Sequence, residues 1–503
     1  MVDLQTRPLG EAAKTAAAAR GADAPPAPEE TPPPLLDLGP VLRESPPWLV
    51  SAVVHMSAMI LLGLIFAQAP VEDDLTLDAG YTEDFGEPLE DDLDMSTEEF
   101  QLDEQVLTPD NLPLVEDPPA MPDMAEVSSN PVLPTGPVMP TTIGVALTGR
   151  EPGMKEALLK SSGGTQQTEG AVALGLRWLA NRQQRSGMWS LVGPYSDGAR
   201  SENEEAATAM ALLAFQGAGY TPLSDKEHPF TPVVQRGWNA LLKRMDENGK
   251  FFQDVRRSHQ LYTQAQCTIA LCELYAMTGD EQYFDAAQKA VDYCVRVQAP
   301  AGGWRYDPDP VSGDSDLSVT GWFVMALQSA RMAGIEVPSS AFERVSEFLD
   351  LVSRGDDRAN APPGSRYAYQ QRSGATLALT AEGLLCRQYL GWQHDDPRLQ
   401  SGVDYLVGNL PVWNKRNVYY WYYATQVCHH MEGAPWREWN GEMRKLLPAR
   451  QETRGRERGS WDPAGDRWGS DGGRLYVTCL SIYILEVYYR HLPLYQTGVF
   501  DGR

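Results

Sequence analysis

Basic residues are missing from a long stretch of this 503-residue sequence. No Lys or Arg occurs between Arg43 and Arg150, although residues 72–126 hold 20 carboxylates. The formal net charge is −26 at pH 7, and nucleic-acid binding depends on clustered Lys and Arg at phosphates. The composition therefore argues against nucleic acid as a partner.

Cysteine pairs at short spacing are also lacking. The six cysteines form no C-x-x-C motif and lie within apolar helical patterns, so we interpret them as buried thiols. One Cys/His cluster is present, Cys428-His429-His430. Successive helical residues diverge by about 100°, so these three side chains cannot face one metal ion. We predict no metal site and no cofactor.

Charge is absent from one further stretch, residues 48–67, whose twenty residues are long enough to cross the roughly 30 Å hydrocarbon core of a bilayer. We predict a single transmembrane helix over residues 47–69. The basic residues near it precede it, so the positive-inside rule places the N-terminus in the cytoplasm. The rest of the chain then lies on the outer, periplasmic side of the inner membrane. A cleaved signal peptide is the alternative, because Ala67-Gln68-Ala69 fits a cleavage pattern.

The segments on either side of this helix are poor in apolar residues. Residues 1–46 are rich in Ala and Pro, and residues 70–165 combine acidic runs with prolines. Such segments cannot bury enough apolar surface to offset their chain entropy. We predict a disordered cytoplasmic segment and an exported, disordered linker. A calcium-binding or partner-docking function remains an alternative for the acidic run.

A repeat organises residues 166–503. Apolar segments rich in Ala, Gly and Thr recur about every 54 residues, and each follows an amphipathic helical segment. The marker threonines of the apolar segments are Thr208, Thr268, Thr320, Thr380, Thr425 and Thr478. Helices that are apolar on all sides must be enclosed, whereas amphipathic helices bury one stripe. The sequence therefore predicts an all-α domain of six helical hairpins, with an inner ring inside an outer ring.

Three loops between an amphipathic and an apolar helix share Gln, Gly and Trp. The three sets are Gln183, Gly187 and Trp189; Gln298, Gly302 and Trp304; and Gln451, Gly459 and Trp461. We expect the Gln to bond the last carbonyls of its own helix and the free N–H groups of the next. The Trp would stack over the amide, and the Gly would allow the tight turn.

This Q-x3-G-x-W element with paired helices resembles the prenyltransferase/squalene oxidase repeat. Squalene-hopene cyclases and protein prenyltransferase β subunits carry that repeat, and the resemblance covers about residues 170–492. It implies an (α/α)6 toroid, similar to a terpenoid cyclase. The segments DLSVTGWFVMAL and NVYYWYYATQVCHH also resemble a membrane-anchored bacterial branch of the family.

The resemblance directs attention to a stretch with two aspartates. Triterpene cyclases carry D-x-D-D-T, and here Asp314 and Asp316 match while Leu317 and Ser318 do not. The two aspartates are candidate catalytic acids. They also suit the start of a helix, where carboxylates bond free N–H groups.

Aromatic residues provide candidates for a central pocket. We predict that the pocket is lined by Trp304, Trp322, Tyr419, Tyr420 and Trp421. The leading interpretation is a tethered toroid that binds a ligand or partner without a complete cyclase or zinc-transferase site. The alternative is an enzyme acting on an isoprenoid by a cyclase-type reaction, or on a glycan by a hydrolase- or lyase-type reaction with two carboxylates.

Overall fold

The computed structural model describes residues 145–309, 314–356, 359–490, 492 and 494–495. The predicted transmembrane helix at 47–69 and the predicted disordered segments before residue 145 lie outside these ranges and stay predictions. Among the described helices, none has the length and apolar character needed to cross a bilayer.

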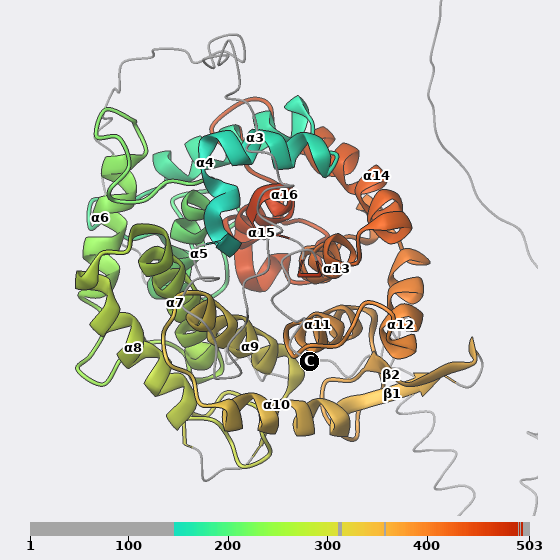
Figure 1. Ribbon diagram of the computed structural model, residues 1–503. Helices are drawn as coiled ribbons and strands as arrows, with labels where there is room; N and C mark the ends of the chain where they lie inside the picture. The colour runs from blue at the N-terminus through green and yellow to red at the C-terminus, as the bar shows by residue number, and fades with distance from the viewer. Residues whose placement is uncertain (1–144, 310–313, 357–358, 491, 493, 496–503) are drawn as a thin grey trace, which may run out of the picture. The chain divides into compact units, whose positions relative to one another are not determined.

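Twelve helices form two concentric rings in the described part of the chain, as the sequence predicts (Figure 1). The inner helices are α5 (Glu204–Gly217), α7 (Arg257–Thr278), α9 (Leu317–Met332), α11 (Leu377–Tyr389), α13 (Val418–Met431) and α15 (Gly469–Leu485). The outer helices are α4 (Gln166–Asn181), α6 (Thr231–Leu242), α8 (Glu281–Arg296), α10 (Ser339–Val352), α12 (Pro397–Val407) and α14 (Gly433–Ala449). Each inner helix contacts the next around the circle, and α15 returns to α5, so the ring is closed. The prediction of an all-α, (α/α)6 toroid is confirmed.

The marker threonines explain part of the inner packing. In three repeats the Thr hydroxyl accepts a hydrogen bond from the backbone N–H of the signature Trp, as Thr320 does from Trp304 at 3.0 Å. The equivalent pairs are Thr208 with Trp189 at 2.9 Å and Thr478 with Trp461 at 3.2 Å. A buried N–H left without an acceptor would cost about 1–3 kcal/mol. The threonines therefore attach the start of each loop to its inner helix.

The signature glutamines join neighbouring outer helices. The Gln298 amide donates to the carbonyls of Gly302 at 2.7 Å and Ala341, in α10, at 3.0 Å. The same bonds run from Gln183 to Gly187 and Val233, and from Gln451 to Gly459 and Ala171. The last of these joins α14 to α4 and closes the outer ring. The amide thus bonds carbonyls of the next helix, whereas the sequence led us to expect its N–H groups.

The signature tryptophans bond the last carbonyls of their own outer helices, a role that we predicted for the Gln. The Trp304 indole N–H donates to the carbonyl of Cys294, in the last turn of α8, at 2.9 Å. Trp189 and Trp461 bond Leu179 and Leu447 in the same way. A long indole reaches the last carbonyls of its own helix, which leaves the Gln free to span the gap to the next.

Two regions differ from the sequence-based expectation. Residues 145–165, placed in the linker, include η3 (Val145–Arg150) and α3 (Pro152–Ser161), which pack against α16 (Val487–Arg490). Between α10 and α11 the chain forms an antiparallel hairpin of β1 (Ser353–Asp356) and β2 (Ala361–Tyr367). The short η6 (Trp413–Lys415) precedes α13.

Candidate functional site

The inner helices all begin at the same end of the ring, and a cavity of about 390 Å³ lies there. Four of them begin with a side-chain cap on a free N–H group, from Asn203, Asp316, Thr376 and Asn417. Residues at the beginnings of all six inner helices line the cavity. The volume lies within the range of about 300–1,000 Å³ that is typical of small-molecule sites.

The cavity wall is mainly apolar and aromatic, and its charges are mostly basic. The apolar and aromatic lining includes Leu191, Met210, Tyr262, Trp322, Tyr369, Leu377, Leu379, Tyr419 and Tyr476. The charged residues and the histidine of the lining are Arg200, Arg256, His259, Arg467 and Asp471. One carboxylate therefore stands among the described residues at the wall.

The other end of the ring axis is closed by buried charges. Arg150, from the segment before the toroid, contacts Glu273 at 2.8 Å and donates to the carbonyl of Arg490 at 3.2 Å. Arg490 in turn contacts Glu273 at 3.5 Å and Glu486 at 2.9 Å. Trp322 forms part of the lining both of the large cavity and of a void of about 20 Å³ beside Glu273 and Arg490. Among the described residues, these buried charges therefore close the end of the ring opposite the starts of the inner helices.

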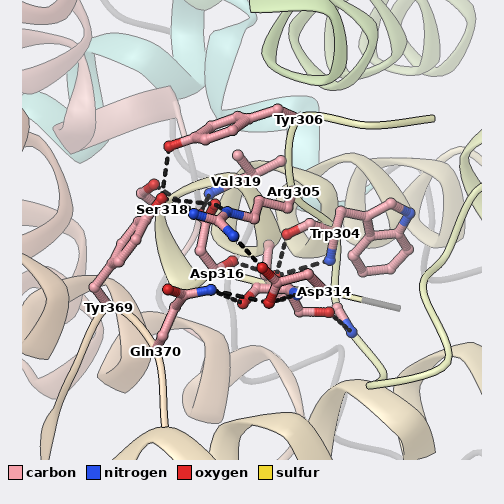
Figure 2. A network of polar contacts seen from close by, with 12 residues as sticks. Trp304, Arg305, Tyr306, Asp314, Asp316, Ser318, Val319, Tyr369 and Gln370 are labelled. Atoms are coloured by element: carbon pink, nitrogen blue, oxygen red, sulfur yellow. Dashed lines mark hydrogen bonds and ion pairs between the residues drawn. The ribbon is translucent and has the colours of Figure 1, made fainter. Parts of the chain in front are cut away.

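Asp316 lies behind the cavity wall in a network of polar contacts (Figure 2). Its side chain is fully buried and accepts hydrogen bonds from the Val319 N–H at 2.9 Å, the Ser318 hydroxyl at 2.8 Å and the Tyr369 hydroxyl at 3.0 Å. Burial raises the pKa of Asp316 to about 6, although these bonds and the Arg305 charge, 3.6 Å away, favour the ionised form. The helix-cap interpretation is thus what the geometry supports.

Asp314 has a different environment. Its carboxylate is 49% exposed, pairs with Arg305 and accepts a hydrogen bond from Gln370 at 2.9 Å. The two predicted catalytic aspartates are therefore close together through Arg305, yet neither belongs to the cavity lining. Tyr369 and Ser318 stand between Asp316 and the cavity.

A second buried acid, Glu382 in α11, escaped the sequence analysis. It is fully buried and accepts a hydrogen bond from the hydroxyl of Tyr419, a wall residue, at 2.7 Å. Burial raises its pKa well above the ordinary value. Any side chain at Gly321 in α9 would collide with the carboxyl group, so the glycine creates its space. The sequence does contain a sign of this buried acid, because Glu382 is the single carboxylate within the apolar segment TLALTAEGLLC.

The predicted aromatic pocket residues separate into two groups. Trp322 and Tyr419 line the cavity, whereas Trp304, Tyr420 and Trp421 do not. Trp304 stacks on Phe323 at 4.6 Å and caps α8. The Tyr420 hydroxyl donates to the carbonyls of Leu406 and Asn409, and Trp421 lies against Trp413. Successive helical residues point in different directions, so 419–421 could not all face one cavity.

The Cys428-His429-His430 cluster lies buried in α13. His429 packs edge-on against Trp436 with ring centroids 4.9 Å apart, and burial lowers its pKa to about 4. Among the described residues, no group of three His, Cys, Asp or Glu side chains is placed to hold a metal ion.

Comparisons with known proteins concern the fold. No protein-family model and no curated protein sequence matches the chain. An inactive variant of an alpha-1,6-mannanase, GH76A of Salegentibacter sp., in complex with alpha-1,6-mannotriose, has 11% identity and a TM-score of 0.44. The match covers 64% of this chain and 99% of that one.

A second solved structure is a variant of the type II terpene cyclase MstE from Scytonema in complex with geranylgeranyl dihydroxybenzoate, with 15% identity and a TM-score of 0.41. The match covers 65% of this chain and 98% of that one. At such low identity a likeness speaks only of fold, so the evidence for activity comes from the site itself. The two closed rings of helices make the described part of this chain an (α/α)6 toroid.

Proposed function

We propose that the toroid binds a largely apolar ligand of the isoprenoid class in its central cavity, and does not cyclise it. The observation that carries this proposal is the cavity of about 390 Å³, which is enclosed at one end and lined by aliphatic and aromatic side chains. Burial of an apolar ligand there is favourable at roughly 25 cal/mol per Å² of surface removed from water. The predicted anchor would bring the toroid near a membrane, where such ligands are found.

The absence of cyclisation is proposed from the position of Asp316. Alkene protonation needs a carboxylic acid aimed into the cavity. Both oxygens of Asp316 already accept hydrogen bonds, and its side chain caps α9. Leu317 occupies the place of the motif's further aspartate, so the D-x-D-D-T acid cluster is incomplete.

A glycan substrate has less support. Hydrolysis by a glycosidase uses two carboxylates that flank the scissile bond. Of the described residues that line the cavity, one is a carboxylate, Asp471, and it lies 4.0 Å from Arg200. The wall therefore offers apolar burial rather than an acid and base pair.

The test is lipid extraction from the purified full chain followed by mass spectrometry, together with binding of a labelled polyprenyl alcohol. Ala378→Trp places an indole at the cavity wall and should weaken binding by about tenfold or more, since a bound ligand needs most of that volume. Ala449→Trp, at an exposed position on α14, is the matched control and should bind normally. Equal binding by both variants would refute the cavity as the site.

The non-cyclase part of the proposal has its own measurement. Wild-type protein incubated with squalene or shorter polyprenyl lipids should return them unchanged. A cyclised product that disappears in Asp316→Asn would overturn it.

A further inference from the structure

Three loops around the cavity mouth form one continuous surface, called the rim below. The rim consists of residues 190–200, 411–417 and 450–468. The Arg456 guanidinium donates to the carbonyl of Pro194 at 3.2 Å, and the N–H of Arg467 donates to the carbonyl of Arg416 at 3.2 Å, so the loops contact one another. Each loop also contributes to the cavity lining, which places the rim beside the mouth.

The rim exposes apolar side chains. Val192 is 45% exposed and Val412 is 55% exposed. Next to Val412 lies Trp413, whose ring is 4.5 Å from the Arg416 guanidinium. Apolar and aromatic side chains next to cationic ones are characteristic of surfaces that contact the boundary between lipid and water.

The rim is also basic in a chain that is acidic as a whole. It holds eight Lys or Arg against five Asp or Glu, although the chain's net charge is −26. The exposed basic residues include Arg200, Lys415, Arg454, Arg456, Arg458 and Arg467. A cluster of four to eight such residues on one face is sufficient for attraction to anionic lipid.

Two of the rim's five carboxylates bond other groups of the protein. Asp197 pairs with the buried Arg474 at 2.6 Å, and Glu457 accepts a hydrogen bond from the indole of Trp178 at 2.8 Å. Acids held in this way leave the outward-facing arginines to set the potential of the surface.

We propose that the rim docks on an anionic lipid bilayer, so that the cavity mouth faces the membrane surface. The inference rests on the proposed function, because a lipid-like ligand would then pass between bilayer and cavity without crossing water. The exposed valines, and the tryptophan beside one of them, lie among arginines. This combination favours a lipid surface over an acidic protein, because an acidic protein could be bound by the basic charges alone.

The experiment measures how close the rim lies to lipid in the full chain, mixed with or reconstituted into vesicles. A fluorophore is attached at Val412→Cys or, as the matched control, at Leu223→Cys. Leu223 is 58% exposed in the loop between α5 and α6, at the opposite end of the ring. All six native cysteines are buried. Quencher-bearing lipids should quench the probe at 412 and not at 223, and more strongly in anionic than in zwitterionic bilayers.

Charge neutralisation is the second arm. The triple variant Arg454→Gln, Arg456→Gln and Arg458→Gln should lower rim association by on the order of a hundredfold, and added salt should act in the same direction. The control neutralises three exposed lysines outside the rim, Lys226, Lys289 and Lys445, and should leave quenching unchanged.

Three outcomes would overturn the inference. One is equal quenching of the probes at 412 and 223. Another is quenching of the probe at 412 that is the same in anionic and zwitterionic bilayers. The third is a probe at 412 shielded from both lipid and aqueous quenchers, which would show that another occupant, such as the acidic residues 72–126, covers the rim.

Ligand content, measured on detergent-solubilised protein, separates the two proposals. Bound lipid without docking refutes only this inference, whereas docking without bound lipid refutes the proposed function.

Discussion

At the scale of single residues, Asp316 shows how one side chain combines a structural role with an unusual titration. It caps α9 and fixes Ser318 and Tyr369, two residues of the cavity wall. Its burial raises its pKa to about 6 from 3.8. Between these two pKa values, the folded chain binds more protons than the unfolded chain. The contribution of Asp316 to the free energy of unfolding therefore falls as the pH rises through this range.

Asp316→Asn removes that charge and keeps a side chain that caps about equally well. The free energy of unfolding should therefore fall with pH in the wild type and not in the variant. The difference, variant minus wild type, should increase by on the order of 2–3 kcal/mol between about pH 4 and pH 7 and then level off. Urea denaturation of both proteins at several pH values measures this difference. Asp314→Asn, which removes the half-exposed carboxylate two residues earlier, is the comparison variant. A flat curve for Asp316→Asn would contradict burial as the cause of the shift.

At the scale of elements, the Gln links hold adjacent hairpins together. Gln298 is buried, and its amide bonds one carbonyl in its own loop and one in α10. Gly302, which has a φ of 95°, brings the loop so close to Arg344 that any side chain there would collide with its carbonyl. The link therefore depends on both residues of the signature.

Gln298→Ala should destabilise the fold by about 1–3 kcal/mol, because it removes two buried hydrogen bonds that join the loop to α10. Gln282→Ala, which removes an exposed amide bonded to Asp280, should cost under about 0.5 kcal/mol. Thermal unfolding of the two variants provides the comparison. Similar losses in both would mean that the loop relaxes to satisfy its carbonyls.

Periodicity made most elements predictable from the sequence. The inner helices are apolar on all sides and the outer ones have one buried stripe, so their order and positions followed from the pattern. The segments that were missed lack such a pattern: β2 contains two prolines in APPGSRY, and η3 and α3 are short. Short segments of this kind are ordered by tertiary contacts, which local sequence does not record.

The site was less predictable than the fold. Adjacent aromatic residues such as Tyr419 and Tyr420 point in different directions, and only the closed ring determines which one reaches the cavity. For Asp316, the sequence defined both candidate roles, and choosing between them needed its hydrogen-bond partners.

At the scale of the whole molecule, buried charges join the first and last described helices to the ring. Arg150 is 3% exposed and contacts Glu273, which also pairs with Arg490. The segment before the toroid is thus part of its closed end and is not a spacer.

Arg150→Met should destabilise the toroid by on the order of 3 kcal/mol, because Glu273 loses one of its two cations in a buried setting. Lys160→Met, at an exposed pair in α3, should change stability little. Calorimetry of the full chain measures both. No loss for Arg150→Met would mean that Arg490 alone satisfies Glu273.

The joint between α14 and α4 is made of the same amide bonds as two joints within the continuous chain. At the closed end of the ring, Arg150 bonds the carbonyl of Arg490, so the first and last described segments are neighbours. Because the seam is built like two of the ring's other joints, the order in which the hairpins follow one another along the chain is not essential to the ring. Circular permutation, with a short bridge between these ends and a new opening in an exposed outer loop, should therefore preserve the toroid.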